Sequence, residues 1–504
     1  MTWIDAFLNR ITMYRLVLYY LTVVWVAALG ASFFDLLPFS TPELLFSTVV
    51  ILGACWITNE VFASVFRVPA NVESVYITGF ILALLIAPVS ATDGAGIGFL
   101  LFASVTAIAS KYILALGKKH LFNPAAFGIA FSALALHQSA TWWAGGSVLL
   151  MPFVLTGGLL VVRKIRRFDL VVAFLLSASI TIALAATDSV TALTQTVTHF
   201  PLFFLALVML TEPLTMPPTR AGRIAYGVLV GVLFAPNVSF WPWAITPEQA
   251  LLIGNLFVYA ISPKGRFVLT LKARNQLASA TEEFIFTPDR PFAFSAGQYL
   301  EWTLEPKGAD ARGNRRYFTI ASSPTESDGT IRLGVKFNDP SSTFKHALQT
   351  LKAGDTVSVA SLAGDFTLPK DPKKKLVFIA GGIGVTPFRS HVQYLMDTHD
   401  SRAVTLFYSN KTAAEIAYKD VFDRAASMIG MKTVYALTNE PSPVPGAHNG
   451  FIDGELIARE VPDYKECVFY ISGPHGMVEA FKKTLRDMGV SRFAIKTDYF
   501  PGFV

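Results

Sequence analysis

The chain contains only two cysteines, Cys55 and Cys467, in 504 residues. An iron–sulfur cluster that is held by thiolates usually needs four cysteine ligands. The sequence therefore predicts no such cluster in this chain. Two cysteines also provide no disulfide framework of the kind that supports small secreted domains.

Charged residues are scarce too: they make up 15% of the chain, against 52% apolar residues, and the mean hydropathy is +0.46. Residues 1–266 hold only 14 of the 42 lysines and arginines. This length predicts two or three domains, and the apolar excess of the first half indicates a membrane protein. The net charge of +6 includes no basic cluster interleaved with aromatic residues, as a nucleic-acid surface needs, so we expect no nucleic-acid partner.

Ten apolar stretches in the first half are long enough, or nearly so, to span a membrane as helices. They are residues 16–37, 43–65, 72–90, 95–116, 122–138, 147–162, 169–187, 199–211, 224–236 and 248–262. The shorter ones predict broken or re-entrant helices, which a membrane tolerates only where protein covers the backbone. No small-residue cleavage site follows the first stretch, so we expect it to be a retained helix.

Lysine and arginine are absent from alternate connections between these stretches. The connections without them lie near residues 38–42, 88–94, 137–146, 188–198 and 237–247. The other connections hold Arg10, Arg15, Arg67, Lys111, Lys118, Lys119, Arg163, Lys164, Arg166, Arg167, Arg220, Arg223, Lys264 and Arg266. By the positive-inside rule, this pattern predicts a multi-pass protein of the inner (cytoplasmic) membrane, with both termini and the second half of the chain in the cytoplasm.

Two polar motifs interrupt the apolar half at predicted cytoplasmic helix ends. They are Phe122-Asn-Pro-Ala-Ala-Phe-Gly128 and Thr211-Glu-Pro-Leu-Thr-Met-Pro-Pro-Thr-Arg220. Proline is common at helix starts, so an ordinary loop is one interpretation. The other is an interrupted helix that exposes amides and hydroxyls to a cofactor or an ion. Glu212 favours the second, because a carboxylate between apolar helices is costly unless it is partnered or functional.

The second half contains a short strand pattern, Arg316-Tyr-Phe-Thr-Ile-Ala-Ser-Ser-Pro324. The period of two places Arg316 and Phe318 on one face and Tyr317 and Thr319 on the other. Downstream, the buried-strand pattern Leu376-Val-Phe-Ile-Ala380 runs into Gly381-Gly-Ile-Gly-Val-Thr-Pro387 and a helical stretch. A strand, a glycine-rich turn and a helix start form an anion site suited to a dinucleotide pyrophosphate.

From Phe267 onward the chain resembles the ferredoxin-NADP reductase superfamily. Four motifs carry the resemblance, in the family's order and spacing: Phe294-Ser-Ala-Gly-Gln-Tyr299, Arg316-Tyr-Phe-Thr, Gly381-Gly-Ile-Gly-Val-Thr-Pro and Ser472-Gly-Pro-His-Gly-Met477. The resemblance implies an antiparallel β-barrel FAD-binding domain at residues 266–369 and an α/β Rossmann-like NAD(P)-binding domain at residues 370–504. Residues 1–265 then form the α-helical membrane domain, with about ten transmembrane helices.

The resemblance also implies roles for the flavin residues. Arg316 would contact the FAD phosphates, Phe318 the isoalloxazine face and Thr319 its N5, with Tyr317 in the same motif. The family commonly has Tyr where Phe318 stands. A helix start at Ser341, Ser342 and Thr343 is expected to hold the pyrophosphate, although a plain helix cap is the alternative.

The nucleotide residues follow from the same resemblance. The pyrophosphate loop is Gly381, Gly382, Gly384, Thr386 and Pro387; the adenosine ribose would lie at Ser409, Asn410 and Lys411; and the nicotinamide would lie at Ser472, Gly473, Pro474 and Met477. No Asp or Glu ends the strand at Ser409, while Lys411 can meet a 2′-phosphate, which favours NADPH over NADH. Phe503 or Phe500 would guard the flavin ring, unless the tail is only a docked end.

The apolar half carries a second resemblance, to the membrane subunits RnfD and NqrB of the Rnf and sodium-translocating NADH:quinone reductase complexes. Asn123-Pro-Ala and Thr211-Glu-Pro-Leu-Thr215 carry it, and it implies a flavin site at Asn123, Glu212 and Thr215. The family usually has Asp at the position of Glu212. It also carries FMN esterified through its phosphate to a threonine, which implies Thr141 in Ser139-Ala-Thr141. Thr194 is a second candidate, and a polar loop capped by interfacial Trp142 and Trp143 is the alternative.

These observations predict a membrane-bound, flavin-dependent NAD(P)H oxidoreductase. Electrons would pass from NAD(P)H through FAD to the membrane flavin and on to a quinone, a metal or an extracytoplasmic redox protein, with possible partner subunits. One alternative is a haem-relayed transmembrane reductase of the ferric reductase or NADPH oxidase kind. It is disfavoured because two bis-histidine haems need four histidines, whereas His120, His137 and His199 lie at predicted helix ends. The other alternative is a redox-driven ion pump or transporter that uses Glu212. No resident metal site is predicted.

Overall fold

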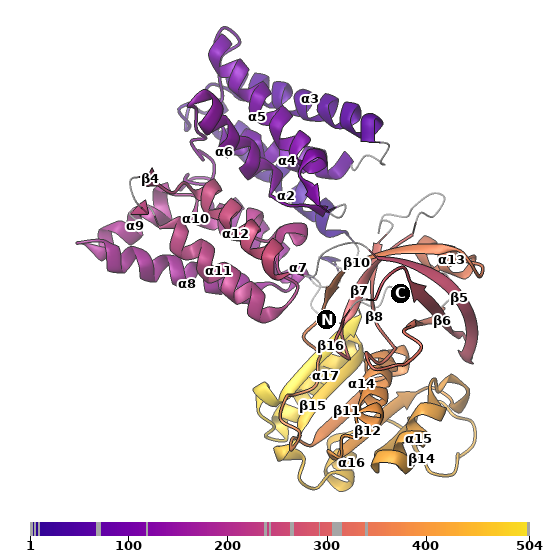
Figure 1. The fold of residues 1–504 in the computed structure, drawn as a ribbon. Helices are drawn as coiled ribbons and strands as arrows, with labels where there is room; N and C mark the ends of the chain where they lie inside the picture. The colour runs from indigo at the N-terminus through magenta and orange to yellow at the C-terminus, as the bar shows by residue number, and fades with distance from the viewer. Residues whose placement is uncertain are drawn as a thin grey trace. The chain divides into compact units, whose positions relative to one another are not determined.

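The chain divides into two compact units, residues 2–265 and residues 266–504, and each is described by itself (Figure 1). The computed structural model describes residues 4, 7–8, 11–66, 72–116, 119–235, 239–240, 243–262, 267–291, 293–304, 315–337 and 341–500.

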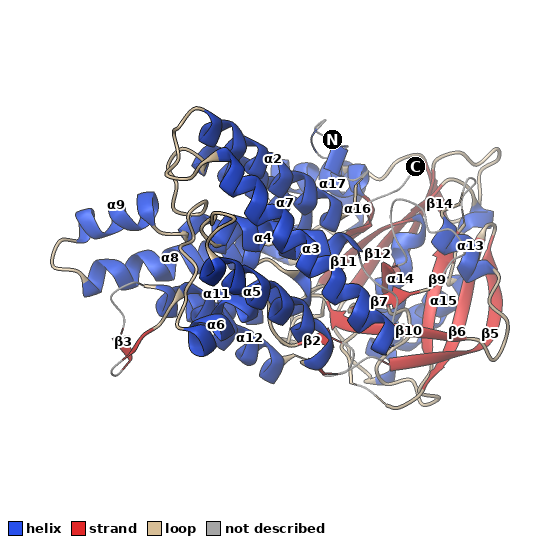
Figure 2. Cartoon of the chain, turned by 90° about the horizontal axis from the view of Figure 1, so that it is seen from above, coloured by secondary structure: helices blue, strands red, loops and turns tan. Residues whose placement is uncertain are grey.

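The first unit is helical (Figure 2). Its helices are α2 (Met13–Phe33), α3 (Thr41–Phe66), α4 (Val72–Leu85), α5 (Gly94–Ile113), α6 (Pro124–Leu136), α7 (Met151–Ile165), α8 (Phe168–Ala185), α9 (Ser189–His199), α10 (Leu202–Phe204), the π-helix η1 (Leu205–Met209), the 3-10 turn η2 (Pro213–Thr215), α11 (Arg220–Phe234) and α12 (Pro247–Ile261). Two hairpins are added by the strand pairs β1 (Ala115–Leu116) with β2 (Lys119–His120) and β3 (Ser239–Phe240) with β4 (Trp243–Ala244).

Every predicted apolar stretch overlaps a helix, but ten membrane spans are not confirmed. By length and composition, α2, α3, α5 and α8 can each cross a membrane. Helix α9 and the segment Leu202–Met209, bent by 66° at their break, would add a fifth span. Helices α4, α6, α11 and α12 have 14, 13, 15 and 15 residues, which at about 1.5 Å per residue is shorter than the roughly 30 Å hydrocarbon core.

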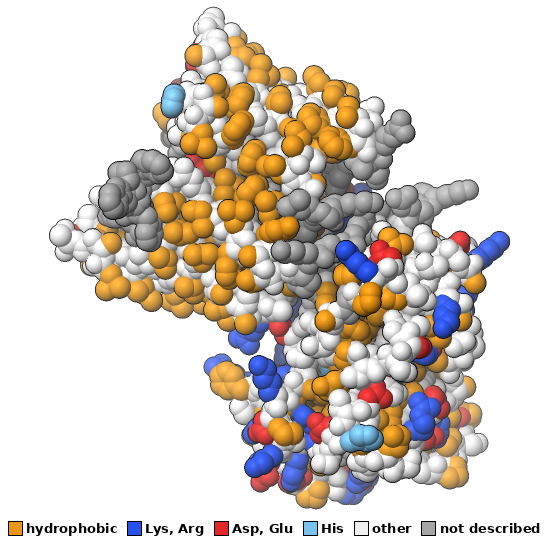
Figure 3. Space-filling model, in the orientation of Figure 1, with side chains coloured by type: hydrophobic (Ala, Val, Ile, Leu, Met, Phe, Trp, Pro, Cys, Tyr) orange, Lys and Arg blue, Asp and Glu red, His pale blue; other side chains and the backbone are white. Residues whose placement is uncertain are grey.

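The surface of this unit is rich in apolar side chains (Figure 3). Val49, Val65 and Leu184 are 69%, 71% and 83% exposed on α3 and α8. Large apolar patches of this kind mark membrane or interaction surfaces. One expected connection is corrected: residues 188–198 were predicted as a loop, yet residues from Ser189 form α9. Asp188 caps that helix by accepting a hydrogen bond from the Thr191 amide, which makes a helix favourable in a polar segment.

The second unit begins with a six-stranded antiparallel sheet in the order β8-β7-β10-β5-β6-β9. The strands are β5 (Phe267–Ala278), β6 (Thr281–Pro288), β7 (Tyr299–Thr303), β8 (Arg315–Thr319), β9 (Ile331–Lys336) and β10 (Thr356–Ala363). The first residues of β5 alternate between buried and exposed, as in a sheet with one covered face. Helix α13 (Thr343–Gln349) contributes Phe344 to the core beside Trp302 and Phe286.

A parallel sheet follows, in the order β14-β13-β12-β11-β15-β16. Its strands are β11 (Leu376–Gly381), β12 (Val404–Asn410), β13 (Lys432–Leu437), β14 (Ala447–Asn449), β15 (Val468–Pro474) and β16 (Ile495–Phe500), with helices α14 (Thr386–Asp397), α15 (Lys419–Ile429), α16 (Gly454–Glu460) and α17 (His475–Asp487). Every residue of β11 is buried, as expected where both faces are covered. The strand order reverses direction at β11, and ligands of such sheets bind at the carboxyl ends of the strands beside that point. The predicted antiparallel and parallel sheets are both confirmed.

Candidate functional site

Strand β8 presents the predicted flavin residues on two faces. The rings of Phe318 and Phe344 lie 5.8 Å apart, and the Arg316 guanidinium lies 5.3 Å from the Phe344 ring centroid. Arg316 and Phe318 therefore share one face, beside α13. Tyr317 points the other way; it is half exposed, and its hydroxyl donates to Glu301 at 3.3 Å.

Several buried hydroxyls in the second unit have no hydrogen-bond partner among the described residues, and two of them belong to predicted site residues. These two are Thr319 Oγ1 at the end of β8 and Ser472 Oγ in β15, in residues that are 2% and 0% exposed. A buried polar atom is normally paired in a native protein, so each hydroxyl fits a polar group supplied by a ligand. These are the residues predicted to meet the flavin ring and the nicotinamide, and the chemistry of the donor set suits both.

The start of α13 shows the plain cap that the sequence left open. The side chain of Ser342 accepts a hydrogen bond from the Lys345 amide at 3.3 Å, and Ser341 and Thr343 flank it. A serine in this role satisfies one of the free amides at a helix start. The binding of a pyrophosphate by these three residues stays a prediction.

The glycine-rich segment lies against the predicted nicotinamide motif. A Cβ at Gly384 would lie 2.5 Å from the Ser472 carbonyl oxygen, and one at Gly381 would lie 2.4 Å from the Met477 sulfur. The backbone contact at Gly384 therefore requires glycine, whereas a side chain at Gly381 would displace the flexible end of Met477. Gly382, at a φ of +53°, opens the turn η3 (Gly382–Val385) that precedes α14. At the start of that helix the Thr386 hydroxyl donates to the Ile383 carbonyl, and the buried Pro387 stands in the first turn.

The predicted ribose residues lie at the carboxyl end of β12, where Ser409 is in register with Gly381. Asn410 is buried, and neither of its amide atoms has a partner among the described residues, whereas Lys411 is exposed. The sequence reasoning missed Glu440, which follows β13 and accepts a hydrogen bond from the Ala413 amide at 2.5 Å. Only the folded loop places this carboxylate beside the end of β12.

The last strand brings the end of the chain to the same edge of the sheet. In the β15–β16 register Ser472 is opposite Asp498, and Pro474 is opposite Phe500. Asp498 was not predicted, and its only signal in the sequence is its place just before the aromatic tail. Phe503 lies outside the described residues, and only the backbone of Phe500 is described.

The two interrupted motifs of the helical unit meet at Glu212. Its Oε2 accepts hydrogen bonds from Asn123 Nδ2 at 2.9 Å and from the Thr215 hydroxyl at 3.2 Å. Its Oε1 lies 2.9 Å from Nε2 of His120. The Asn123 amide donates to Asn255 Oδ1 at 2.8 Å. The sequence predicted Asn123, Glu212 and Thr215, but it missed Asn255 and weighed His120 only as a haem ligand.

Thr141 lies away from this cluster. Its hydroxyl donates to the Leu85 carbonyl at 3.4 Å, and the next residue, Trp142, donates from its indole to Glu248 at the start of α12. Asn255, which contacts Asn123, follows Glu248 by seven residues of the same helix, about 10 Å along its axis. Thr194 lies within α9, where its hydroxyl donates to the Val190 carbonyl.

Trp142 is 5% exposed and is therefore packed inside the helical unit. Its amide donates to the Leu85 carbonyl, and the Trp143 indole donates to the carbonyls of Ala83 and Ile86. The last carbonyls of a helix have no partner within it. The loop therefore folds onto the end of α4, where it satisfies those carbonyls.

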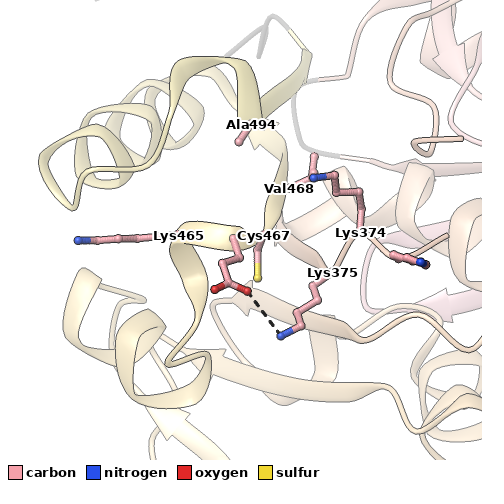
Figure 4. A pocket seen from close by; sticks show the side chains of 8 residues that line it. Lys374, Lys375, Lys465, Cys467, Val468 and Ala494 are labelled. Carbon is pink, nitrogen blue, oxygen red and sulfur yellow. Dashed lines mark ion pairs between the residues drawn. The ribbon is translucent and has the colours of Figure 1, made fainter. Parts of the chain in front are cut away.

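A basic surface depression lies at the opposite, amino edge of the parallel sheet (Figure 4). It is lined by Lys373, Lys374, Lys375, Lys465, Glu466, Cys467, Val468 and Ala494. Lys375 pairs with Asp463, and its hydrogen bond lowers the pKa of that carboxyl. Ligands of open parallel sheets bind at the carboxyl edge, so these lysines lie away from the predicted nucleotide site.

Comparison with known proteins locates the nucleotide domain in sequence. A family model of the oxidoreductase NAD-binding domain matches residues 378–483. This match agrees with the parallel strand order and the glycine-rich loop of the same region. Residues 378–483, in the parallel-sheet part of the second unit, are therefore similar to an oxidoreductase NAD-binding domain.

The chain is similar to a subunit of the Na(+)-translocating NADH-quinone reductase. The protein from Neisseria gonorrhoeae is 31% identical over 203 residues, which are 37% of this chain and 49% of that protein. The one from Klebsiella pneumoniae is 31% identical over 223 residues, 42% of this chain and 53% of that protein. The chain thus spans about half the length of these curated relatives. The crystal structure of the Amycolatopsis cytochrome P450 reductase GcoB matches with a TM-score of 0.42 and 28% identity, over 47% of this chain and 69% of that one.

Proposed function

We propose that this protein is a membrane-bound NADH dehydrogenase that passes electrons from cytoplasmic NADH through FAD to a flavin in the helical unit. The buried, unpartnered hydroxyls of Thr319 and Ser472 carry the proposal, because the family resemblance assigns them to the flavin and the nicotinamide. FAD bound there would accept a hydride and release electrons one at a time, a chemistry that belongs to the cofactor.

The chain's own residues bind and orient the two cofactors. Thr319 would donate its free hydroxyl to a ring nitrogen of the flavin, and Phe318 would support the ring from the face it shares with Phe344. Arg316, on that face, would neutralise a phosphate. The glycine-rich loop before α14 would hold the pyrophosphate of the nucleotide with its amides.

NADH rather than NADPH is the nucleotide that we propose. The carboxylate of Glu440 is held at the Ala413 amide, beside the loop that would hold the ribose. A carboxylate there can bind a 2′-hydroxyl and repels a 2′-phosphate. Lys411 would attract a 2′-phosphate, but its side chain is exposed and solvent screens its charge. The curated relatives are named as NADH-quinone reductase subunits, which supports NADH and a quinone as acceptor.

The helical unit would carry the membrane flavin and place it within reach of an acceptor in or beyond the membrane. The cluster of Asn123, Glu212 and Thr215 offers hydrogen bonds to it, and Thr141 is the proposed site of covalent FMN. The lysine and arginine pattern supports an inner-membrane protein with a cytoplasmic reductase module. Partner subunits belong to the proposal, because the relatives are themselves subunits.

The test is a visible spectrum of the full-length protein purified in detergent, followed by acid denaturation. We expect two flavins, with yellow fluorescence retained by the polypeptide. A Soret band would instead favour haem, and FAD released without retained fluorescence would contradict covalent FMN.

Ion pumping is a second candidate, favoured by the carboxylate of Glu212 within a largely buried polar cluster. Sealed vesicles with an internal sodium-sensitive or pH-sensitive dye would report ion movement when NADH is added. NADH oxidation without ion movement would exclude a pump.

A further inference from the structure

Three consecutive residues of α14 each donate a hydrogen bond to the backbone of the antiparallel-sheet part of the second unit, which is the proposed flavin domain. The Arg389 guanidinium donates to the Ala321 carbonyl at 3.0 Å, the Ser390 hydroxyl to the Ser322 carbonyl at 2.6 Å, and His391 Nε2 to the Ala296 carbonyl at 3.2 Å. Each side chain therefore spans between the two domains of the reductase module. All three residues are buried, at 5%, 0% and 0% exposure, so water does not compete for these hydrogen bonds.

These contacts lie close in the chain to the residues that are proposed to bind the flavin and the nucleotide. Ala321 and Ser322 follow Thr319, the proposed partner of the flavin ring, by two and three residues. Helix α14 begins at Thr386, directly after the glycine-rich loop. A covalent and hydrogen-bonded route from the flavin strand to the nucleotide loop thus passes through this helical turn.

Charge strengthens the contact at Arg389. Its guanidinium pairs with Glu326 of the flavin domain. Glu326 also lies 3.3 Å from Arg332 of β9, and Arg332 lies 3.0 Å from Glu283 of β6. Hydrogen bonds between charged groups are shorter and stronger than neutral ones, and this chain of pairs extends from α14 across two strands of the barrel.

His391 is held by packing on every side. Its ring lies 5.6–6.2 Å from the rings of Phe366, Phe378, Phe388 and Tyr470. Gly297, at a φ of +87°, approaches so closely that a Cβ there would lie 2.3 Å from His391 Nε2. The imidazole can therefore serve as a fixed donor, because there is no room for it to turn.

An independent contact lies on the barrel side. A Cβ at Gly334 of β9 would lie 2.9 Å from the Thr386 methyl and 2.6 Å from the Tyr418 hydroxyl. The absence of a side chain at Gly334 therefore allows the first residue of α14 to lie against the barrel. An added methyl group at this point would force the Tyr418 and Thr386 side chains to shift.

We propose that Arg389, Ser390 and His391 are positioning residues that set the approach of the nicotinamide to the flavin ring, with Gly334 fixing the spacing from the barrel. This inference rests on the proposed function. Hydride transfer requires the reacting atoms to lie about 3–3.5 Å apart, and a misplacement of about 1 Å can lower a rate about a hundredfold. The three side chains act through the backbone that they hold, without touching either cofactor.

The experiment is anaerobic stopped-flow reduction of the bound FAD by NADH in the full-length protein. Ser390→Ala and His391→Phe each remove one donor and keep the packing. Gly334→Ala adds a methyl group between β9 and the start of α14. Ser390→Thr and His391→Gln retain a donor and serve as rescue variants. Thr398→Val is the matched control, because its hydroxyl bonds only to carbonyls within α14.

We expect the limiting rate of flavin reduction to fall about tenfold in each single variant and about a hundredfold in the double variant Ser390→Ala/His391→Phe. The apparent Kd for NADH should stay within about twofold, because the nucleotide loop itself is unchanged. The long-wavelength charge-transfer band should weaken, and the deuterium isotope effect with 4-deuterated NADH should rise. The rescue and control variants should behave as the unaltered protein.

An unchanged limiting rate and charge-transfer band in a double variant that retains FAD would overturn the proposal. If that variant loses its FAD, Ser390→Ala and Gly334→Ala decide by the same readouts. A fall in rate with a matching rise in Kd and no change in isotope effect would also contradict positioning. Unaltered protein that binds FAD reducible by dithionite but by neither nucleotide would contradict the proposed function instead.

Discussion

Nε2 of His120 lies 2.9 Å from Oε1 of Glu212, although 92 residues separate them in the chain. The pair lies between β2 and the interrupted segment before α11, and Asn123 binds the second oxygen of the same carboxylate. A carboxylate among apolar helices is normally functional or partnered, and Glu212 has three partners. It is therefore the residue of the helical unit whose chemistry can be tested most directly.

Replacing Glu212 by Gln should separate the two halves of the reaction. The neutral amide removes the charge that faces His120 but keeps the size of the side chain. We expect the rate of FAD reduction by NADH to be unchanged and the reduction of a quinone acceptor to fall at least about tenfold, the effect of about 1.4 kcal/mol. Glu60→Gln, at an exposed carboxylate of α3, is the control. Equal rates of quinone reduction in both variants would show that Glu212 is not needed for electron transfer to the quinone.

Replacing Thr319 by Val should slow flavin reduction without releasing FAD. The isosteric change removes the buried hydroxyl that has no partner among the residues the structure describes, and the loss of one hydrogen bond in a buried site costs about 1–3 kcal/mol. Stopped-flow reduction should show a fall of about tenfold to a hundredfold, with Thr319→Ser close to the unaltered protein. The control is Thr350→Val, which removes an exposed hydroxyl bond at the end of α13. A normal rate in Thr319→Val would show that this hydroxyl does not contact the flavin.

Covalent FMN, if it is carried at Thr141, should be lost in Thr141→Val and kept in Thr194→Val. Thr141 is exposed next to a backbone held at the end of α4, whereas the Thr194 hydroxyl donates within its own helix. In-gel fluorescence of the denatured protein under ultraviolet light measures the attached flavin. Fluorescence that persists in Thr141→Val and disappears in Thr194→Val would reverse the assignment.

The reductase module should lose stability below about pH 6.5 because of His391. Burial lowers the pKa of this imidazole from 6.5 to about 3. Between these two values the unfolded chain binds a proton that the folded protein does not, so the free energy of unfolding falls as the pH falls. At pH 5.5 the loss from this residue is about 1.4 kcal/mol relative to neutral pH.

Urea unfolding followed by flavin fluorescence at pH 7.5 and pH 5.5 measures this effect. His391→Phe fills the same aromatic surroundings without a titrating group, so its loss of stability between the two pH values should be smaller by about 1.4 kcal/mol. The same pH dependence in both proteins would mean that His391 is not the group responsible.

Much of the architecture follows from local sequence patterns. The buried run Leu376-Val-Phe-Ile-Ala380, the glycines after it and the alternation in β5 each reflect a backbone requirement that neighbouring residues satisfy together. The division between an apolar half and a charged half is likewise visible in composition alone. For this reason the two sheets and the helical unit could be predicted, and the motif residues of β8 and β11 could be named.

The tertiary structure decided which distant residues meet. Glu212 meets Asn123 across 89 residues, Asn123 meets Asn255 across 132, and Arg389 reaches Ala321 across 68. Contacts of this range depend on how whole helices and domains pack, and no local pattern encodes them. Packing also placed Trp142 inside the helical unit, and only the folded structure shows that several apolar helices have 13–15 residues. The sequence by itself therefore determined the two halves of the protein and their motifs, whereas the partners of Glu212 and the turn of α14 that joins the two domains arise only from the fold.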